Sequence, residues 1–414
     1  MAIFRPFKAL RPKAALAERV LAPPYDVMNR AEAKAMAGEN AYSFLRVTRA
    51  EIELPDGTGA YDARVYERSR ENLDGFVRDG VFFRDEKAGF YIYRQTVDGR
   101  TQTGLVGCVS IDAYESGAIK RHELTRVEKE EDRVRHFEVC DANTEPVFLT
   151  YRANARIDDL TGGFADARPP VYDFASADGV RHALWVVDDN AVREALVRAF
   201  SEVDALYIAD GHHRSASAYR VGKKRRDEYP GFDGTEEFNF FMAVAFPDRE
   251  LRIFDYNRVV RDLNGLSAAA FLTALERRFA VEARGTVPCA PREKHCFGMF
   301  LAGAWYALRA RDNLIPGEDR IGALDVSILQ NGLLAPVLGI EDPRTDGRID
   351  FIGGIRGLAE LERRVRTDMA VAFSLCPVSV AELLAIADGG LIMPPKSTWF
   401  EPKLGSGLFV HTLY

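Results

Sequence analysis

Cysteine is scarce in this sequence, and its spacing suits neither cross-linking nor metal binding. The 414 residues contain five cysteines, an odd number, and no two of them form a CxxC pair. They are Cys108, Cys140, Cys289, Cys296 and Cys376. Disulfide-stabilised folds carry dense, even sets of cysteines, and structural zinc sites offer well-spaced groups of ligands. The sequence therefore argues against both classes and predicts a protein of the reducing cytoplasm.

Long hydrophobic runs and an excess of positive charge are also missing. The most apolar stretch, 238–246, is far shorter than the ~18 residues that a membrane span needs. Near the N-terminus Arg5, Lys8, Arg11 and Lys13 interrupt any apolar run, so a signal peptide is not expected. Lysine and arginine number 55 against 62 aspartates and glutamates, which leaves a net charge of -7. Because nucleic-acid binding needs a basic face, we expect no nucleic-acid partner. The short apolar runs likewise lead us to expect no membrane partner.

What the chain does contain is the composition of a large soluble protein. With 47% hydrophobic and 28% charged residues, it can bury a core without help from disulfides or metals. Single cores rarely grow beyond roughly 250–300 residues, so two or three domains are expected. The 26 phenylalanines and 15 tyrosines can fill such a core or cover the interface of a homodimer. Both alternatives stay open at this level.

Strand and helix patterns alternate along the whole chain, which predicts a mixed α/β (α+β) fold. An alanine-rich helix is expected over 30–37, and Asp98-Gly99 is expected to form the turn of a β-hairpin. The pattern resets in the second half of the chain. We therefore predict a first domain over 1–250, and a C-terminal α+β domain over 251–414 whose tail loop can return to the site.

The most informative stretch begins with an apolar strand and continues into a helix. The strand ends at Asp210, Gly211 permits a tight turn, and small alanine- and serine-rich residues begin the helix. Backbone N–H groups without partners and the helix dipole make such a junction an anion site. The acid can hold Mg²⁺ or orient a histidine, and the other residues can donate to a phosphate. The candidate site residues of this block are Asp210, Gly211, His212, His213, Arg214 and Ser215.

A second polar cluster lies over 119–125. Arg121 and His122 could clamp a phosphate or a carboxylate, and Glu123 could accept a proton from a hydroxyl. A solvated surface explains this cluster equally well. For the charged run over 128–135 we adopt the simpler interpretation, a solvated helix face with ion pairs one turn apart.

Two loops add further candidates. Prolines stiffen the loop over 393–408, in which Lys396, Ser397 and Thr398 could present one cation and two hydroxyls to a phosphate. It is not a P-loop, because the spaced glycines that should precede the lysine are missing. A rigid closing loop explains this segment as well. The turn around Asn143 adds one candidate ligand contact.

The chain resembles a bacterial and archaeal family of proteins known as a domain of unknown function. The resemblance runs from the turn over 23–27 to the segment over 403–407, and its most specific marks are the blocks over 209–214 and 393–398. The first block is similar to the DGHHR element in the ParB/sulfiredoxin-like superfamily, a group of small α/β folds that bind phosphate compounds. That superfamily includes the free-serine kinase of archaea. The resemblance therefore implies a ParB/sulfiredoxin-like core with large insertions.

The same resemblance implies an activity. It points to a phosphotransferase that exchanges a phosphoryl group between a nucleotide (ADP/AMP or ATP) and the hydroxyl of serine, interconverting serine and O-phosphoserine with Mg²⁺. On that analogy Asp210 and His212 lie at the reacting centre, where Asp210 can also hold Mg²⁺. Glu123 is our candidate for the base that receives the hydroxyl proton, although no family motif assigns it that role.

Further binding roles are expected, partly from the analogy and partly from the polar clusters described above. Asn257 stands where relatives carry a histidine before Arg258. If that histidine is catalytic in relatives, this protein has lost it or works differently. The residues expected to hold phosphate or nucleotide are Gly211, His213, Arg214, Ser215, Arg121, His122, Lys396, Ser397, Thr398 and Lys403. The residues expected to contact the substrate are Tyr25, Asp26, Asn143 and Arg258.

Two other functions stay compatible with these residues. A nucleotide-binding regulatory protein of ParB-like type would use the same pocket without turnover, and a phosphoserine phosphatase would let water replace the nucleotide. A sulfinic-acid reductase, which the superfamily also contains, needs a nucleophilic cysteine in the anion-binding turn, and none lies near 210–214. A shared fold does not decide between transfer, hydrolysis and regulation.

Overall fold

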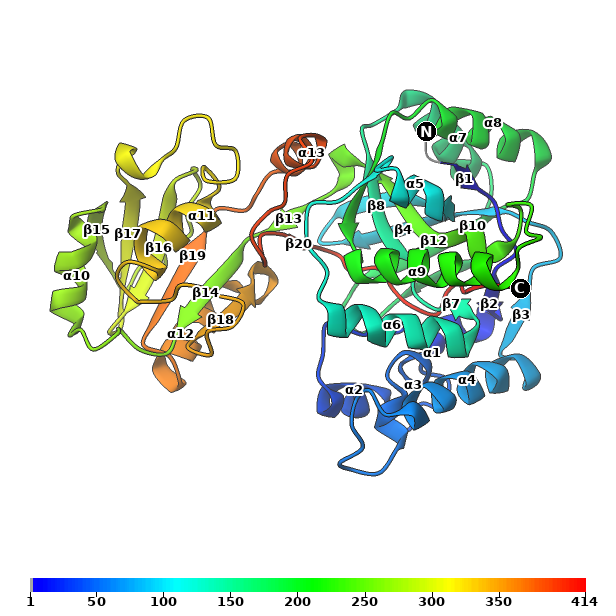
Figure 1. Cartoon of the computed structure of the whole chain (residues 1–414), viewed down its shortest axis with the longest axis horizontal. Coiled ribbons are helices and arrows are strands. Elements are labelled where there is room, and N and C mark those ends of the chain that lie inside the picture. Colours follow the sequence, from blue (N-terminus) through cyan, green and yellow to red (C-terminus); the bar gives the residue numbers. More distant parts are fainter. Residues whose placement is uncertain (1–2) are drawn as a thin grey trace. The chain divides into compact units, whose positions relative to one another are not determined.

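Figure 1 shows the computed structural model, which describes residues 3–414 and in which helices and strands alternate along the chain. This alternation confirms the predicted mixed α/β class. The chain divides into two units, the first formed by residues up to Leu251 together with Pro402–Tyr414, the second by Arg252–Glu401. Within the described residues, no helix is both long and apolar enough to cross a membrane.

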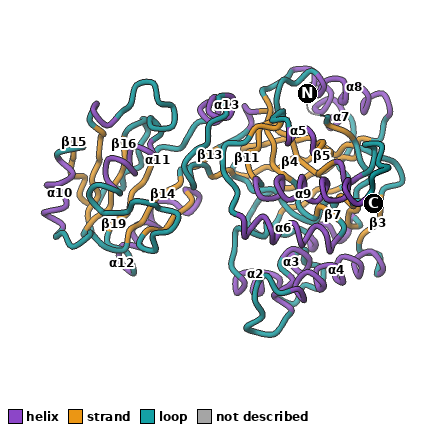
Figure 2. The backbone as a smooth tube through the Cα atoms, in the orientation of Figure 1, coloured by secondary structure: helices purple, strands orange, loops and turns teal. Residues whose placement is uncertain are grey.

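The first unit is built around a nine-stranded mixed sheet, whose strands are orange in Figure 2. All eight residues of β12 (Phe240–Pro247) are buried, which requires cover on both faces of the sheet. The order across the sheet is β6 (Ile119–Lys120), β11 (Leu206–Asp210), β8 (Val147–Tyr151), β12, β5 (Arg100–Ser110), β4 (Phe90–Val97), β10 (Arg181–Val187) and β9 (Tyr172–Ala175), with β1 (Phe4–Arg5) on β5.

Helices of the first unit cover this sheet, and two of them, α6 and α9, pack side by side (Figure 1). At the start of α2, the Asn29 side chain accepts the N–H of Glu32 at 3.0 Å, while the Glu32 carboxylate accepts the N–H of Asn29 at 2.8 Å. This reciprocal cap confirms the predicted helix over 30–37. The helices are α1 (Ala17–Val20), α2 (Arg30–Ala37), α3 (Leu45–Thr48), α4 (Ala63–Arg78), α5 (Ile111–Glu115), α6 (Val127–Cys140), α7 (Ala155–Asp166), α8 (Asn190–Ser201) and α9 (His212–Glu228).

The predicted hairpin at Asp98-Gly99 is confirmed. β4 and β5 pair antiparallel up to Val97 opposite Arg100, with only these two residues between them. Asp98 and Gly99 have positive φ angles of 50° and 72°. Such left-handed residues give a two-residue turn the twist that an antiparallel pair requires.

The C-terminal tail belongs to the first unit and is held there by backbone pairing. Ser406 forms an antiparallel bridge with Ala22, and β21 (His411–Thr412) pairs with β7 (Ala142–Asn143). Within the tail, Gly407 has a φ of 92°, and a Cβ at this position would lie 2.7 Å from the Phe44 ring. Backbone geometry and packing therefore both require glycine here. A second small pair joins β2 (Leu10–Pro12) to β3 (Phe82–Arg84).

Replacing this glycine should loosen the tail. Gly407→Ala is expected to lower the free energy of unfolding by about 2–4 kcal/mol, because it combines a strained backbone with overpacking against Phe44. Urea denaturation measures the change. Gly57→Ala is the matched control, since Gly57 has a φ of 90° but nothing lies within 4 Å of the place that its Cβ would occupy. It should show the cost of strain alone, and equal losses in the two variants would contradict the packing argument.

The second unit is an antiparallel sheet with helices, the α+β arrangement expected for the C-terminal part. The strand order is β15 (Phe279–Gly285), β17 (Ala304–Ala310), β16 (Cys296–Leu301), β19 (Val371–Leu375), β14 (Tyr256–Val260) and β18 (Ile349–Gly353). A separate pair joins β13 (Ile253–Phe254) to β20 (Trp399–Phe400). The helices are α10 (Ala268–Glu276), α11 (Asp325–Leu329), α12 (Gly357–Thr367) and α13 (Val380–Asp388), and α11 continues into a π-helical turn, Gln330–Leu334.

One buried histidine of the first unit gives its stability a pH dependence. The His182 ring lies 5.9 Å from Tyr93 and 5.6 Å from Phe174, centroid to centroid. Its nitrogens pair with the hydroxyls of Tyr93 at 2.6 Å and of Ser176 at 2.9 Å. Burial lowers the pKa of His182 to about 4, against the opposing attraction of Asp178. The folded protein therefore keeps this ring neutral.

The direction of the effect follows from the two states. An unfolded histidine titrates near ~6.5, so the unfolded chain binds the extra proton first as the pH falls. The contribution of His182 is complete above about pH 6.5 and is lost as the pH falls through about 4. We expect His182→Gln to reduce the drop in unfolding free energy between pH 7 and pH 5 by about 2 kcal/mol. Urea denaturation at both pH values tests this, and an unchanged drop would contradict it.

Candidate active site

Two polar segments that are far apart in the sequence meet at one edge of the nine-stranded sheet. β6 and β11 pair in parallel, with Ile119 opposite Leu206. Because both strands run in the same direction, the residues that follow them emerge at the same edge. The groups Arg121–Glu123 and Asp210–Arg214, which the sequence suggested separately, are therefore neighbours.

Asp210 is the charged centre of this edge. Its Oδ1 accepts the N–H of Gly211 at 2.9 Å, and its Oδ2 lies 3.3 Å from Lys403 Nζ and 3.7 Å from Arg214 Nη2. Burial acts to raise the pKa of Asp210, but Lys403 and Arg214 outweigh it and hold that pKa well below its usual range. We call Asp210, Arg214 and Lys403 the Asp210 cluster. It joins a strand end, a helix start and the returning tail around one ionised carboxylate.

Gly211 makes the turn from β11 into α9 possible. It has a φ of 95°, and a Cβ here would lie 3.0 Å from Arg214 Nε. No side chain caps the N-terminus of α9, so its first-turn N–H groups, apart from that of Ser215, are available to an anion. Ser215 donates both its N–H, at 2.9 Å, and its hydroxyl, at 3.1 Å, to the Gly211 carbonyl. The Ser215 hydroxyl, expected to hold phosphate, is thus engaged within the helix.

Two buried histidines lie beside the Asp210 cluster. The rings of His122 and His212 meet edge to face, with their centroids 4.5 Å apart. Neither nitrogen of His122, nor Nε2 of His212, has a hydrogen-bond partner of good geometry within the described residues. Burial lowers the pKa of His122 to about 4 although Asp210 opposes the shift. Burial and the neighbouring His122 likewise lower the pKa of His212. Both rings are therefore neutral near pH 7 and have nitrogens left for a ligand.

Three residues of this edge can hold a metal ion. One ligand atom each from His122, Glu123 and His212 lies within 4.8 Å of the other two. Two imidazoles and a carboxylate suit Zn²⁺ or a similar transition metal better than Mg²⁺, which prefers oxygen ligands. Asp210 is not part of this group, and its Oδ2 already faces two cations. Mg²⁺ bound directly to Asp210 stays a prediction.

His213 has a structural partner. Its Nε2 accepts the backbone N–H of Arg126 at 3.0 Å, which leaves the ring proton on Nδ1. Burial, together with Lys129, lowers the pKa of His213. This bond ties the segment before α6 to the first turn of α9, so any contact of the ring with phosphate must come through Nδ1.

A buried carboxylate connects the predicted Tyr25–Asp26 turn to the tail. Glu145 Oε1 accepts the N–H of Tyr25 and the Ser406 hydroxyl, both at 3.0 Å, and Oε2 lies 3.8 Å from Arg133 Nη1. The Arg133 guanidinium stacks 4.0 Å over the Tyr25 ring. Burial raises the pKa of Glu145 in spite of Arg133 and Arg214. Glu145 thus joins the turn, the tail and α6 next to the Asp210 cluster.

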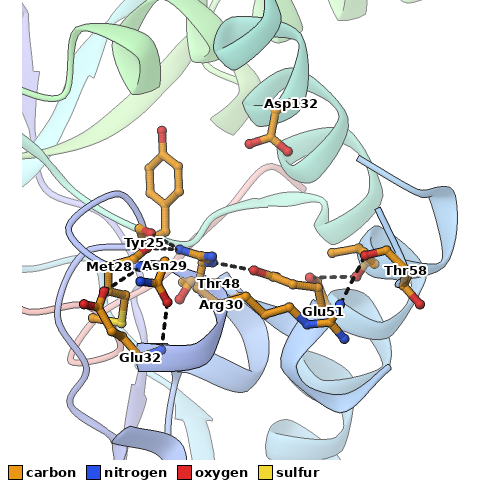
Figure 3. A network of polar contacts seen from close by, with 12 residues as sticks. Tyr25, Met28, Asn29, Arg30, Glu32, Thr48, Glu51, Thr58 and Asp132 are labelled. Carbon is orange, nitrogen blue, oxygen red and sulfur yellow. Dashed lines mark hydrogen bonds and ion pairs between the residues drawn. The ribbon is translucent and has the colours of Figure 1, made fainter. Parts of the chain in front are cut away.

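A second polar network, centred on Arg49, holds the backbone of the turn at Tyr25. In Figure 3 the Tyr25 ring points away from the dashed contacts that fix its backbone. Arg49 Nη1 donates to the carbonyls of Tyr25, at 2.7 Å, and Met28, at 2.6 Å, and its Nε lies 2.6 Å from Glu51. Arg30 extends the network by donating to the Thr58 carbonyl at 3.2 Å. The turn is therefore rigidly placed beside the site.

The interpretation of 128–135 as a solvated helix face is wrong at the charged residues Asp132 and Arg133, which are buried like the apolar Val134 beside them. Glu128 and Arg135 are exposed, but Asp132 and Arg133 are only 9% and 5% exposed. The Asp132 carboxylate accepts from the Tyr66 hydroxyl at 2.9 Å and pairs with Arg133 at 2.8 Å. Asp132 and Arg133 lie one helical turn before the buried His136 and Phe137, so the spacing indicates that they share the buried face of the helix. The high charge of the run made a solvated face the simpler prediction.

Two further predicted contacts lie in the first unit. Asn143 is 2% exposed, and its side chain pairs with His411 at 3.0 Å, which anchors the tail strand. Arg121 is exposed and lies 4.8 Å over the Tyr114 ring. Its charge also acts to lower the pKa of His212. Arg121 is therefore within electrostatic range of the site, whereas Asn143 supports the tail.

The remaining predicted residues belong to the second unit, where Arg258 contacts Lys396. Arg258 Nη2 donates to the Lys396 carbonyl at 3.0 Å, and the Ser397 hydroxyl donates to the Pro394 carbonyl at 2.6 Å. Thr398 follows in the same half-buried loop. The loop over 394–398 is therefore held by hydrogen bonds within the second unit, one of them from Arg258.

The fold and the site together define a mixed α/β protein with a strand–helix junction whose helix start carries no side-chain cap. A model of the family DUF1015, described as a protein of unknown function, matches residues 4–327. The chain belongs to this family, which confirms the resemblance seen in the sequence. No curated protein matches the chain.

Several solved structures have detectable similarity to the chain. Free serine kinase in complex with AMP has a TM-score of 0.35 and 13% identity over 71% of this chain and 86% of its own. SbnI with C-terminal truncation, from Staphylococcus aureus, has a TM-score of 0.39 and 13% identity over 74% and 86%. A conserved hypothetical protein from Pyrococcus furiosus has a TM-score of 0.36 and 13% identity over 74% and 96%. The function of this chain must be derived from its own residues.

Proposed function

We propose that this protein exchanges a phosphoryl group between a nucleotide and the hydroxyl of serine, interconverting serine and O-phosphoserine. The observation that carries the proposal is the Asp210 cluster, in which an ionised carboxylate lies between two cations at the uncapped start of α9. The choice of serine and of ADP/AMP or ATP rests on the similarity of the block over 209–214 to the DGHHR element.

The cluster suits the electrostatic demands of phosphoryl transfer. The reaction needs positioning and charge neutralisation more than covalent help from the protein. The Lys403 side chain is 19% exposed and can reach a phosphate. The Arg214 side chain is only 3% exposed, so it acts by holding the Asp210 carboxylate in place. The N–H groups of α9 add fixed donors. Mg²⁺ bound with the nucleotide phosphates, with Asp210 as its protein ligand, would supply further neutralisation.

The chemical step assigns each proton and bond. The serine hydroxyl oxygen attacks the terminal phosphorus of the nucleotide, so that a new O–P bond forms while the phosphoanhydride O–P bond breaks. The shortened nucleotide leaves with the bridging oxygen, and the hydroxyl proton passes to Glu123. His212, held neutral by burial and lying with Glu123 within 4.8 Å, would orient that carboxylate or the hydroxyl. The reverse reaction uses the same groups.

Phosphorus NMR tests the proposal directly. The full chain is incubated with Mg²⁺ and O-phosphoserine, with and without AMP or ADP. We expect new phosphoanhydride signals and a loss of O-phosphoserine that depends on the nucleotide. Free phosphate produced without nucleotide would make the protein a phosphatase instead. If nucleotide binds and nothing is consumed, the proposal fails and a regulatory role replaces it.

A further inference from the structure

The second unit contains a cavity lined only by its own residues. It has a volume of about 260 Å³ and lies between β14, β18, the π-helical turn after α11 and the proline loop. Ligand pockets commonly have volumes of about 300–1,000 Å³, so this one suits a small molecule. Its walls combine apolar side chains with four polar ones, Arg258, Ser327, Gln330 and Asn331.

Arg258 is a buried cation without an acidic partner. The residue is 4% exposed, and its guanidinium donates to the carbonyls of Tyr256 and Lys396 and lies 5.3 Å over the Phe351 ring. Among the described residues no carboxylate forms an ion pair with it, and burial lowers its pKa to about 10. A guanidinium has five N–H donors, so two carbonyls leave others available. A buried charge of this kind calls for a counter-ion.

Two further polar atoms of the cavity lack a protein partner. The Ser327 hydroxyl is buried in a residue that is only 5% exposed, and it makes no hydrogen bond among the described residues. Gln330 donates from Nε2 to the Ile340 carbonyl at 2.7 Å, which fixes the amide and leaves Oε1 buried without a donor. Gln330 also begins the π-helical turn, a distortion that is frequent at functional sites.

The charge balance of the cavity selects the ligand. One cation without an acidic partner requires a single negative charge, because a dianion would remain partly uncompensated. Gln330 Oε1 is a neutral acceptor, so it suits a hydroxyl better than an ammonium group, for which no carboxylate is present among the lining residues. Val326, Leu334 and Phe351 offer an apolar wall for the rest of the molecule.

We propose that the second unit binds a small α-hydroxy acid with an apolar side chain. Its carboxylate would pair with Arg258 and accept from the Ser327 hydroxyl, while its own hydroxyl would donate to Gln330 Oε1. The sequence predicted that Arg258 contacts the substrate of phosphotransfer. The cavity instead assigns Arg258 to a different ligand. The assignment does not depend on the proposed phosphotransfer.

Isothermal titration calorimetry of the full chain with α-hydroxyisocaproate, without nucleotide, tests the proposal. We expect saturable binding that weakens about 10-fold for isocaproate, which lacks the hydroxyl, since one lost hydrogen bond is worth about 1.4 kcal/mol. Leucine and inorganic phosphate should each bind at least about 10-fold more weakly than α-hydroxyisocaproate. No binding of α-hydroxyisocaproate, or tighter binding of leucine or phosphate, would overturn the proposal.

Variants locate the binding. Arg258→Gln should abolish it, and Ser327→Ala should weaken it about 10-fold by removing one donor. Arg366→Gln is the control, because Arg366 is an exposed arginine of the same unit that pairs with Glu362 at 2.7 Å. If Arg258→Gln does not fold, Ser327→Ala still decides, since unchanged affinity there would contradict the assignment. Asp210→Asn should bind the acid normally, so failure of the phosphotransfer proposal would leave this result intact.

Discussion

Asp210→Asn is expected to abolish phosphoryl transfer while leaving the fold in place. The amide is isosteric with the carboxylate and can still accept the N–H of Gly211, the bond that shapes the start of α9. What disappears is the negative charge between Lys403 and Arg214. Without it Lys403 and Arg214 lose the carboxylate that they share, and the proposed Mg²⁺ loses the carboxylate assigned to it. We expect turnover to fall by at least about 1,000-fold, the scale of losing a transition-state electrostatic group.

The expected loss of stability is small by comparison. The Asp210 side chain is 29% exposed, so water can compensate much of what Lys403 and Arg214 lose. Asp204→Asn is the matched control, because Asp204 is an exposed aspartate just before β11, the strand that ends at Asp210. Phosphorus NMR gives the turnover and thermal unfolding gives the stability of both variants. If the Asp210→Asn protein retained transfer at the rate of the Asp204→Asn control, Asp210 would not be at the reacting centre.

Local sequence rules succeeded wherever one short segment determines the structure. The capped helix over 30–37 and the hairpin at Asp98-Gly99 depend only on neighbouring residues and their turn geometry. The junction at Asp210-Gly211 was recognisable for the same reason, since strand, turn and helix follow each other directly. These predictions needed no knowledge of tertiary contacts.

The parts that the sequence could not reveal depend on contacts between distant segments. The sequence suggested that Lys403 holds phosphate and that the tail returns to the site, but not that the Lys403 ammonium lies against Asp210, because that pairing depends on tertiary structure. Glu145 was overlooked inside a turn whose partners, Tyr25 and Ser406, are 120 and 261 positions away. Charged residues in sequence are assigned to solvent by default, and only tertiary structure shows which are buried in pairs.

Arg133→Met is expected to be the most destabilising substitution next to the site. Removing the guanidinium leaves the buried Asp132 without its cation, takes one of two nearby cations from Glu145, and removes the stacking on Tyr25. Breaking a buried pair from one side typically costs about 3–5 kcal/mol, because the remaining charge is uncompensated. Urea denaturation measures this loss. Arg135→Met, two residues along α6 and exposed, controls for the loss of charge and should be nearly neutral.

A double variant separates the buried charge from simple loss of packing. Glu145→Gln keeps the shape of the side chain and its acceptor oxygen for Tyr25, but it removes the charge that faces Arg133 at 3.8 Å. In the Arg133→Met background this second change should therefore recover part of the stability, whereas in the wild-type background it should reduce it. Strictly additive losses would mean that Arg133 acts through Asp132 and Tyr25 and not through Glu145. Recovery would show that the rigid turn and tail beside Asp210 depend on balanced charge in the interior.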